Sequence, residues 1–173
     1  MAWRASRDST RHQAAASVKI HLLAVGTKMP GWVVTAFEEY AKRMPRECSI
    51  GLREIPPAHR GKSGNPDRYK AEEAQRILSA LPKGAHLVVL DEHGKSWTTK
   101  QLSQQLDGWM HSGQDVALVV GGPDGLDPSV MQLAQQKWSL SALTLPHPMV
   151  RILLAEQLYR AWTILQGHPY HRE

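Results

Sequence analysis

Apolar runs alternate with amphipathic segments along most of the chain, a pattern that predicts strands alternating with helices. The expected strands are residues 18–25, 49–55, 86–90, 115–120 and 140–145. The expected helices are about 32–44, 66–80, 98–113, 128–138 and 149–166. Strands joined in this way run parallel and need helices on both faces of their sheet. The sequence therefore predicts an α/β fold with a largely parallel sheet flanked by helices.

Two of the expected helices begin with a strong start signal. Asn65 precedes Pro66, and Asp127 precedes Pro128, so each pair offers a capping side chain followed by proline at the first helical position. The last helix, 149–166, is apolar around most of its circumference, which is typical of a helix buried on more than one side. Either a partner subunit or the chain's own core covers it, and we favour a homodimer.

Composition narrows the class of protein. The chain has 173 residues, 42% of them hydrophobic, and a mean hydropathy of −0.40, which fits one domain over 18–173. No apolar run approaches the ~20 residues that span a membrane. Cys48 is the only cysteine, which indicates a reducing compartment, and we expect a cytoplasmic protein. We expect no metal site, because His168 and His171 lack a nearby third ligand.

The N-terminal segment differs from the rest of the chain. Residues 1–17 are rich in alanine and arginine and have no periodic apolar face, so we expect a disordered extension. An organellar transit peptide is a weaker alternative, since the segment is short and contains Asp8.

The formal net charge of +5 is unevenly distributed. Residues 59–70 set four cations against one acidic side chain, Asp67. The cations are Arg60, Lys62, Arg68 and Lys70. Such a patch is typical of a surface that binds a polyanion such as RNA, and an ordinary solvated loop is the alternative.

The expected fourth strand ends in a glycine-rich motif, "VVGGPDGL", residues 119–126. Gly121 and Gly122 are adjacent and no lysine follows, which excludes both the dinucleotide fingerprint and the phosphate-binding P-loop. The glycines permit a close approach to the backbone, and Pro123 restricts the turn. The motif predicts either a preformed ligand surface or a tight strand-to-helix connection.

Ligands of open parallel sheets bind outside the carboxyl ends of the strands. Three segments follow strands here: "LDEHGK" after the third, "GGPDG" after the fourth and "LTLPHP" at the end of the fifth. They offer backbone groups and apolar side chains with little positive charge. This combination favours a nucleoside-like ligand without phosphates over ATP or NAD.

Several segments together resemble a known family. "LLAVGTKMPGWV", "LDEHGK", "VVGGPDGL", "WSLSALTLPHPMVRILLAEQLYRAW" and "HPYHRE" occur in order over about 18–173. This set is similar to the ribosomal large-subunit pseudouridine methyltransferase H family of the SPOUT superfamily. The resemblance implies an S-adenosylmethionine-dependent enzyme that methylates N3 of a pseudouridine in 23S rRNA on the assembled ribosome. It also implies a homodimer whose fold ends in a deep trefoil knot.

The resemblance places the cofactor against the three strand-exit segments. The implied cofactor-binding residues are Leu90, Gly121, Leu140, Ser141, Ala142, Leu143, Thr144 and Leu145. Similar proteins begin near the residue that matches Val18, so residues 1–17 reflect either an upstream start or a cloning remnant. We assign residues 1–17 no catalytic role.

Methyl transfer from a sulfonium to an imide nitrogen is an in-line displacement, so the protein must align two reactants and help remove the N3 proton. His147 lies between two prolines at the expected pocket, and Arg151 one turn later is expected to hold a phosphate or a base oxygen. Tyr170, His171 and Arg172 form a polar aromatic tail suited to stacking on a splayed base and contacting RNA backbone. The proton acceptor is His147 or His171.

Purely structural roles are the alternative for these residues. His147 fits a structural turn, and the tail fits a frayed terminus. Glu156 and Arg160 have the spacing of a helix-surface pair or a dimer contact. A non-catalytic RNA-binding or ribosome-assembly factor with the same fold is the rival function, and it would need no S-adenosylmethionine pocket. An α/β hydrolase is disfavoured because the G-x-S-x-G motif is missing.

Overall fold

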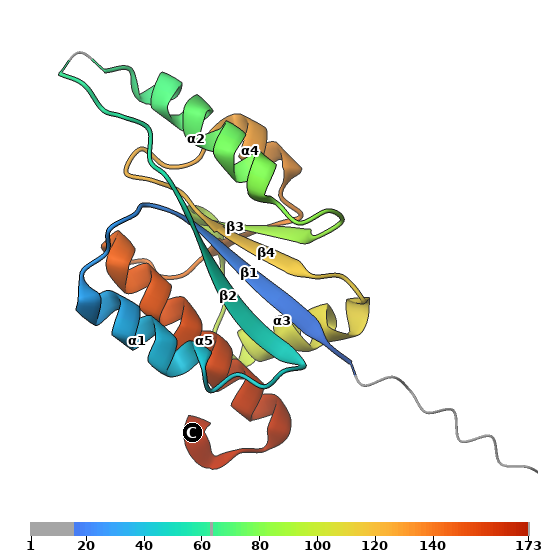
Figure 1. Cartoon of the computed structure of the whole chain (residues 1–173). Helices are drawn as coiled ribbons and strands as arrows, with labels where there is room; N and C mark the ends of the chain where they lie inside the picture. The colour runs from blue at the N-terminus through green and yellow to red at the C-terminus, as the bar shows by residue number, and fades with distance from the viewer. Residues whose placement is uncertain (1–15, 63, 173) are drawn as a thin grey trace, which may run out of the picture.

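The computed structural model describes residues 16–62 and 64–172, so most of the predicted N-terminal extension, 1–17, lies outside the described residues. Five parallel strands form one sheet in the order β2-β1-β4-β3-β5 (Figure 1). They are β1 (Val18–Val25), β2 (Cys48–Ile55), β3 (His86–Ser96), β4 (Val116–Val120) and β5 (Gln136–Ser139). The prediction of a parallel α/β sheet is confirmed.

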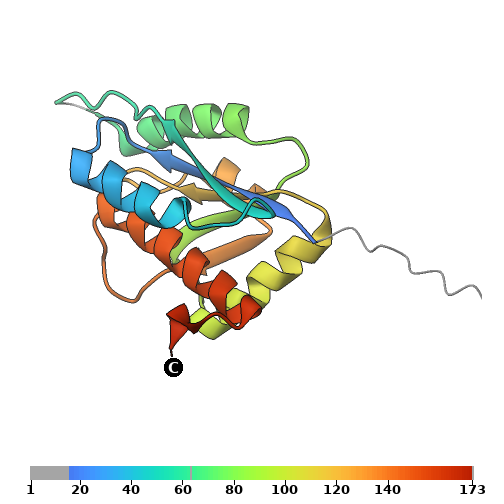
Figure 2. The same cartoon turned by 60° about the horizontal axis from the view of Figure 1, so that its bottom comes forward.

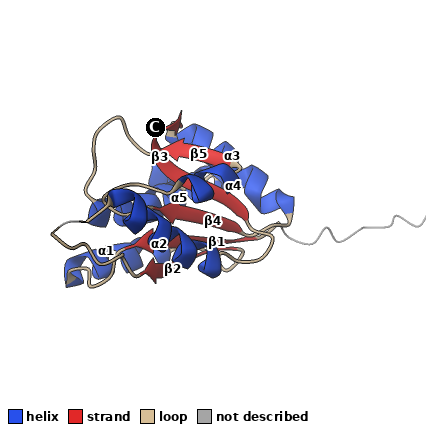
Figure 3. Cartoon of the chain, turned by 90° about the horizontal axis from the view of Figure 1, so that it is seen from above, coloured by secondary structure: helices blue, strands red, loops and turns tan. Residues whose placement is uncertain are grey.

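Helices cover both faces of this sheet. They are α1 (Gly31–Ala41), α2 (Pro66–Ala80), α3 (Thr99–Ser112), α4 (Pro128–Leu133) and α5 (His147–Gln166), followed by the 3₁₀ turn η1 (Pro169–His171). Helices α2 and α4 lie on one face, and α1, α3 and α5 lie on the other (Figures 1 and 3). Each face has its own buried apolar cluster. Within the described residues, no helix is both long and apolar enough to cross a membrane.

The two predicted helix starts have the expected caps. The Asn65 side chain accepts a hydrogen bond from the Asp67 amide at 2.9 Å, and the Asp127 side chain accepts one from Ser129 at 3.0 Å. These bonds satisfy backbone N–H groups that have no partner inside the helix. The sequence signal therefore located the starts of α2 and α4 correctly.

The fifth strand was predicted at the wrong place. It comprises Gln136–Ser139, whereas the predicted strand at 140–145 is a loop, and the helix predicted to reach residue 138 ends at Leu133. The reason is a pairing with β3. The Gln135 amide donates to Leu87 O at 2.9 Å, and the Gln135 side-chain oxygen accepts from the Leu87 amide at 2.7 Å. These bonds hold a polar segment extended at the sheet edge.

Strand β3 continues further than the predicted 86–90 because it contains a bulge. Leu90 and Lys95 both pair with Trp138 of β5, so the residues between them bulge out of the ladder. A Cβ on Gly94 would lie 2.7 Å from the backbone nitrogen of Trp138, so only glycine fits at this approach. The bulge places residues 91–93 at the carboxyl edge of the sheet.

Helix α5 is buried from several directions within its own chain. It packs against the sheet and against both α1 and α3. Leu154, Leu158 and Ala161 are at most 1% exposed. The chain's own core therefore accounts for much of the apolar surface that suggested a partner subunit, and the homodimer remains a prediction.

Candidate functional site

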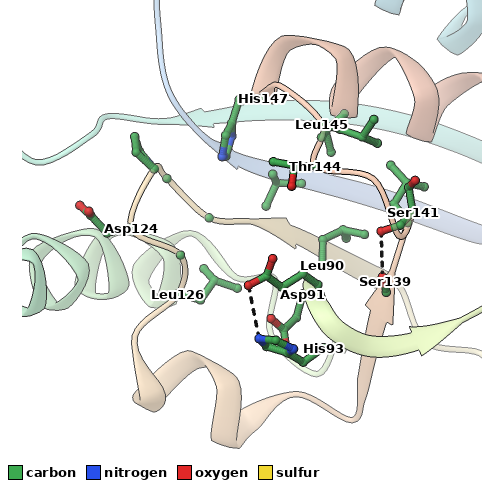
Figure 4. Close-up of a pocket in the computed structure, with 18 of the residues that line it drawn as sticks. Leu90, Asp91, His93, Asp124, Leu126, Ser139, Ser141, Thr144, Leu145 and His147 are labelled. Carbon is green, nitrogen blue, oxygen red and sulfur yellow. Dashed lines mark hydrogen bonds and ion pairs between the residues drawn. The ribbon is translucent and has the colours of Figure 1, made fainter.

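A pocket of about 610 Å³ lies at the carboxyl edge of the sheet, where three segments meet (Figure 4). The segments are the β3 bulge, the turn after β4 and the loop between β5 and α5. All eight residues predicted to bind a cofactor line this pocket: Leu90, Gly121, Leu140, Ser141, Ala142, Leu143, Thr144 and Leu145. Six of these belong to a loop and not to the predicted strand, yet the fold still brings them to the same cavity.

The glycine turn after β4 is shaped by contacts within the chain. The Gly125 amide donates to Gly122 O at 3.0 Å, and Gly125 has a φ of +85°, a conformation that favours glycine. A Cβ on Gly121 would lie 2.9 Å from Leu126 Cγ and 3.0 Å from the Gly125 backbone. Gly121 is therefore needed for the turn to close on itself, and a substitution there would disturb the turn before it met any ligand.

The loop between β5 and α5 is braced by its own serines. Ser139 Oγ donates to Ser141 O at 3.3 Å (Figure 4). Ser141 Oγ in turn accepts from the Leu143 amide at 2.9 Å. Leu143 is 75% exposed, more than any other large apolar side chain in the described part of the chain. The loop therefore offers an apolar side chain that its own core does not cover.

His147 begins α5 and lines the pocket beside Thr144 and Leu145 (Figure 4). Burial lowers the pKa of His147 below its ordinary value of 6.5, and the nearby Arg151 guanidinium lowers it further. Both effects disfavour the charged imidazolium. His147 is thus mainly neutral at neutral pH, and a neutral imidazole can accept a proton.

Arg151, predicted to hold the substrate, lies outside this pocket. Its side chain is 2% exposed, with Nη1 donating to Glu54 Oε2 at 2.8 Å and Nη2 donating to Gly26 O at 3.0 Å. It borders a second cavity of about 320 Å³, whose apolar lining includes Val33 and Phe37 of α1. The structure thus gives Arg151 a structural role between α5 and β2 and does not bring it to the pocket.

The C-terminal tail is ordered against α5. Tyr170 Oη donates to Glu156 Oε1 at 3.1 Å, and the Tyr170 ring lies edge-on to Tyr159 with centroids 4.7 Å apart. Burial raises the pKa of Tyr170, and the Glu156 carboxylate raises it further. Glu156 also pairs with Arg160 at 2.6 Å, so the two residues form an ion pair one helical turn apart within the chain. The tail is therefore a docked element and not a frayed end.

The tail does not reach the pocket of its own chain. The 20 residues of α5 separate His147 from the tail, which corresponds to ~30 Å of helix. Figure 2 shows the C-terminus at the end of α5 that lies beside α3. Tyr170, His171 and Arg172 are thus grouped together, but far from His147.

The predicted basic patch divides into paired and exposed cations. Arg60 forms ion pairs with Glu73 at 3.0 Å and Asp124 at 2.9 Å. Arg68 is 79% exposed, and its ion pair with Glu72 on the same helix is long, at 3.6 Å. Lys62 is also exposed. Lys70 lies 3.5 Å from Asp67 and is mostly covered. The exposed positive charge is therefore on Lys62 and Arg68, while Arg60 is held by structural partners.

Sequence reasoning missed the acidic side chains of the pocket. Asp91 and Glu92 of the bulge and Asp124 of the turn line it, and it has no lysine or arginine among its lining residues. The motif "LDEHGK" was noted as a strand exit, but its spacing did not reveal that β3 would resume after Gly94.

Comparisons with known proteins extend over nearly the whole described chain. Residues 18–171 match the family model described as "Predicted SPOUT methyltransferase". A protein from Hydrogenovibrio crunogenus named "Ribosomal RNA large subunit methyltransferase H" is 65% identical over 156 residues, which cover 90% of this chain and all of that protein. The protein of the same name from Hahella chejuensis is 60% identical over 156 residues, which again cover 90% of this chain and all of that protein.

Solved structures share the architecture at low sequence identity. A probable methylase family protein from Haemophilus influenzae Rd KW20 superposes with a TM-score of 0.50 at 13% identity, covering 89% of this chain and 70% of that one. TrmJ from Z. mobilis ZM4 also gives 0.50, at 16% identity, covering 86% of this chain and 71% of that one. At these identities the likeness concerns the fold alone.

Proposed function

Since the chain belongs to the SPOUT methyltransferase family, we propose that it transfers the methyl group of S-adenosylmethionine to N3 of a pseudouridine in 23S rRNA of the assembled ribosome. One observation carries the proposal. The chain is 65% identical to a ribosomal RNA large subunit methyltransferase H over that protein's full length, and the residues implied for the cofactor converge on one pocket. A cytoplasmic location follows from a ribosomal substrate.

The pocket has the chemistry that S-adenosylmethionine requires. Leu90, Leu126 and Leu145 give it apolar walls suited to a nucleoside. Asp91 and Glu92 supply carboxylates, while the lining has no lysine or arginine for a phosphate. Acidic side chains suit a ligand with a sulfonium and an amino group, since opposite charges attract. The cofactor, when bound, supplies an electrophilic methyl group on sulfur.

His147 is the best-placed group to accept the N3 proton. It lines the pocket, and burial together with Arg151 keeps its pKa low, so the imidazole is neutral and able to act as a base. Methyl transfer would replace the bond between the methyl carbon and the sulfonium sulfur by a bond to N3, with S-adenosylhomocysteine as the leaving group, and a ring nitrogen of His147 would take up the N3 proton. His171, the other candidate, lies ~30 Å along α5 and would have to come from a second subunit.

A homodimer would bring the tail to a pocket. Because α5 keeps each tail far from its own pocket, Tyr170 and His171 would act on a base held by the partner subunit. Exposed apolar side chains support an interface near the pocket end of α1: Trp32 is 57% exposed, Val34 46% and Leu52 of β2 37%. Val34 and Leu52 line one cavity, and exposed apolar side chains that lie together are typical of protein contact surfaces.

The chain path is consistent with the trefoil knot that the resemblance implies. Strand β5 lies at one edge of the sheet and β2 at the other. After β5, the loop at 140–146 runs along the carboxyl edge of the sheet beside the glycine turn. Helix α5 then contacts β2 through the ion pair between Arg151 and Glu54. We include the knot in the proposal because the chain belongs to the SPOUT methyltransferase family, whose resemblance implies it.

Mass spectrometry of ribosomal RNA tests the proposed function. Ribosomes that lack the modification are incubated with the protein and S-adenosylmethionine, and digested 23S rRNA is searched for N3-methylpseudouridine. We expect the product with assembled ribosomes and at most traces with protein-free 23S rRNA. Ribosome binding without methyl transfer would instead support a non-catalytic RNA-binding or ribosome-assembly factor.

A further inference from the structure

Arg60 connects three segments that lie far apart in the sequence. Its Nε and Nη2 both donate to Asp124 Oδ2, at 3.1 and 2.9 Å. Its Nη1 donates to Glu73 Oε2 at 3.0 Å and to Ala58 O at 3.1 Å. The guanidinium also lies over the Tyr69 ring, 5.2 Å from the centroid. Arg60 thus joins the β2–α2 loop and α2 to the glycine turn of the pocket.

On the Glu73 side, the contacts of Arg60 are buried and closely packed. Glu73 is 2% exposed, and its Oε2 also accepts from the Ala58 amide at 2.9 Å. A Cβ on Gly122 would lie 2.9 Å from Glu73 Oε1 and 3.4 Å from Arg60 Nη2, so the turn packs directly on the ion pair. A buried carboxylate needs such a partner, and losing it is costly. Arg60 is therefore fixed on the Glu73 side and presents its other edge to Asp124.

The outer half of the connection holds a residue that lines the pocket. Asp124 borders the cavity, whereas Arg60 is not among the lining residues. The Arg60 and Asp124 side chains are both 27% exposed, so their pair is only partly screened by water. A lysine at position 60 could not reproduce the two N–H groups that Arg60 directs at Asp124 Oδ2, because its ammonium is a single point charge.

We propose that Arg60 is a positioning residue, whose ion pair with Asp124 holds the turn at 121–126 in the conformation that binds the cofactor. Cofactor affinity then depends on a side chain that does not reach the cofactor. This inference rests on the proposed function and refines it, since Arg60 was first predicted to contact RNA.

Calorimetric titration with S-adenosylmethionine tests the pairing. Asp124→Asn is the main variant, because it weakens the outer pair and leaves Arg60 and Glu73 together. We expect Asp124→Asn and Arg60→Lys each to weaken binding about tenfold, which is ~1.4 kcal/mol. The double variant should bind no more weakly than the weaker single variant, because both changes break one interaction. Glu47→Gln, which also replaces an acidic side chain by its amide, at an exposed position just before β2, is the charge-matched control for Asp124→Asn and should bind as wild type.

Non-additivity separates positioning from direct contact. If Asp124 touched the cofactor itself, its substitution would weaken binding further in the Arg60→Lys background, and that additive result would overturn the proposal. Wild-type affinity in both single variants would overturn it as well. Thermal unfolding of each variant shows whether a loss of binding reflects a loss of fold.

Hydrogen exchange of the free protein provides a readout that needs no cofactor. Asp124→Asn should speed exchange of the amides at 124–126 relative to those of β4, whereas Glu47→Gln should not. If wild-type protein bound no S-adenosylmethionine, the proposed function would fail, and the exchange result would still decide whether Arg60 holds the turn. Unchanged exchange in Asp124→Asn would contradict the inference.

Discussion

Arg151 of α5 donates from Nη1 to Glu54 Oε2 of β2 at 2.8 Å, although the two residues are 97 positions apart. The partners differ in burial, since the Arg151 side chain is 2% exposed and the Glu54 side chain 39% exposed. The cost of breaking the pair therefore depends on which partner is left behind. A stranded guanidinium stays buried, whereas a stranded carboxylate can be hydrated.

We predict that Glu54→Gln destabilises the protein more than Arg151→Met does. Leaving the buried guanidinium without its carboxylate should cost about 3 kcal/mol, and removing Arg151 should cost about 1–2 kcal/mol. Urea unfolding of both variants measures these free energies. Equal and unchanged stability would show that Arg151 has no structural role and would restore its predicted part in binding substrate.

The pocket histidine should make stability depend on pH. The pKa of His147 in the folded protein lies below the ordinary value of 6.5 that the unfolded chain retains. Below pH 6.5 the unfolded state therefore binds more protons, and the free energy of unfolding falls as the pH falls toward the folded pKa. We predict a smaller decrease between pH 7.5 and 5.5 for His147→Gln than for wild type. Urea unfolding at both pH values checks this, and identical decreases would contradict it.

Local patterns were enough to predict much of the fold. Strand β1 was predicted at its observed bounds, because Leu22, Leu23 and their neighbours form an apolar run flanked by turn residues. The caps at Asn65 and Asp127 are encoded within two residues of their partners. The pocket also followed from sequence, because strand exits in a parallel sheet share one edge.

Long-range pairings decided what the sequence could not predict. Gln135 immediately precedes β5 and Gln136 begins it. Both are compatible with a helix until the Leu87 backbone, 48 positions away, pairs with Gln135. Arg60 looked like a free cation because Asp124 is 64 positions distant along the chain. Neither partner leaves a signal in local periodicity or charge.

The exposed cations should govern ribosome binding. We predict that Lys62→Ala combined with Arg68→Ala weakens binding to ribosomes. The slope of the logarithm of the binding constant against the logarithm of salt concentration should become shallower by about 0.7–0.9 for each phosphate that the variant no longer neutralises. Binding measured from 50 to 200 mM salt gives the slopes. A double variant of Glu47 and Lys83 to alanine, which removes one exposed charge of each sign elsewhere, is the control. An unchanged slope in the first variant would refute the assignment of this patch to RNA.

The tail should act on catalysis and not on cofactor binding. Because Tyr170 and His171 lie ~30 Å of helix away from their own pocket, deleting 170–173 should leave S-adenosylmethionine affinity within about twofold. The same deletion should lower the single-turnover methylation rate at saturating ribosome by at least about tenfold. A wild-type rate from the truncated protein would remove the tail from the mechanism.

The homodimer can be tested without any ligand. Light scattering at micromolar concentration should give about twice the chain mass of 19.3 kDa. Replacing the exposed Trp32 and Val34 by aspartate should shift the mass toward the monomer, because charges would enter an apolar contact. If the wild-type protein were a monomer, this would contradict the proposal that the tail of each subunit acts at the pocket of its partner.

The central claim is that the pocket at the carboxyl edge binds S-adenosylmethionine, and calorimetric titration of the wild-type protein beside Ala142→Trp tests it most directly. Ala142 lies exposed on the loop that lines the pocket, so a tryptophan there would fill the cavity without entering the core. We predict saturable binding to the wild type and at least about tenfold weaker binding to a folded Ala142→Trp variant. Absence of binding to the wild type, or equal binding to both proteins, would contradict the account.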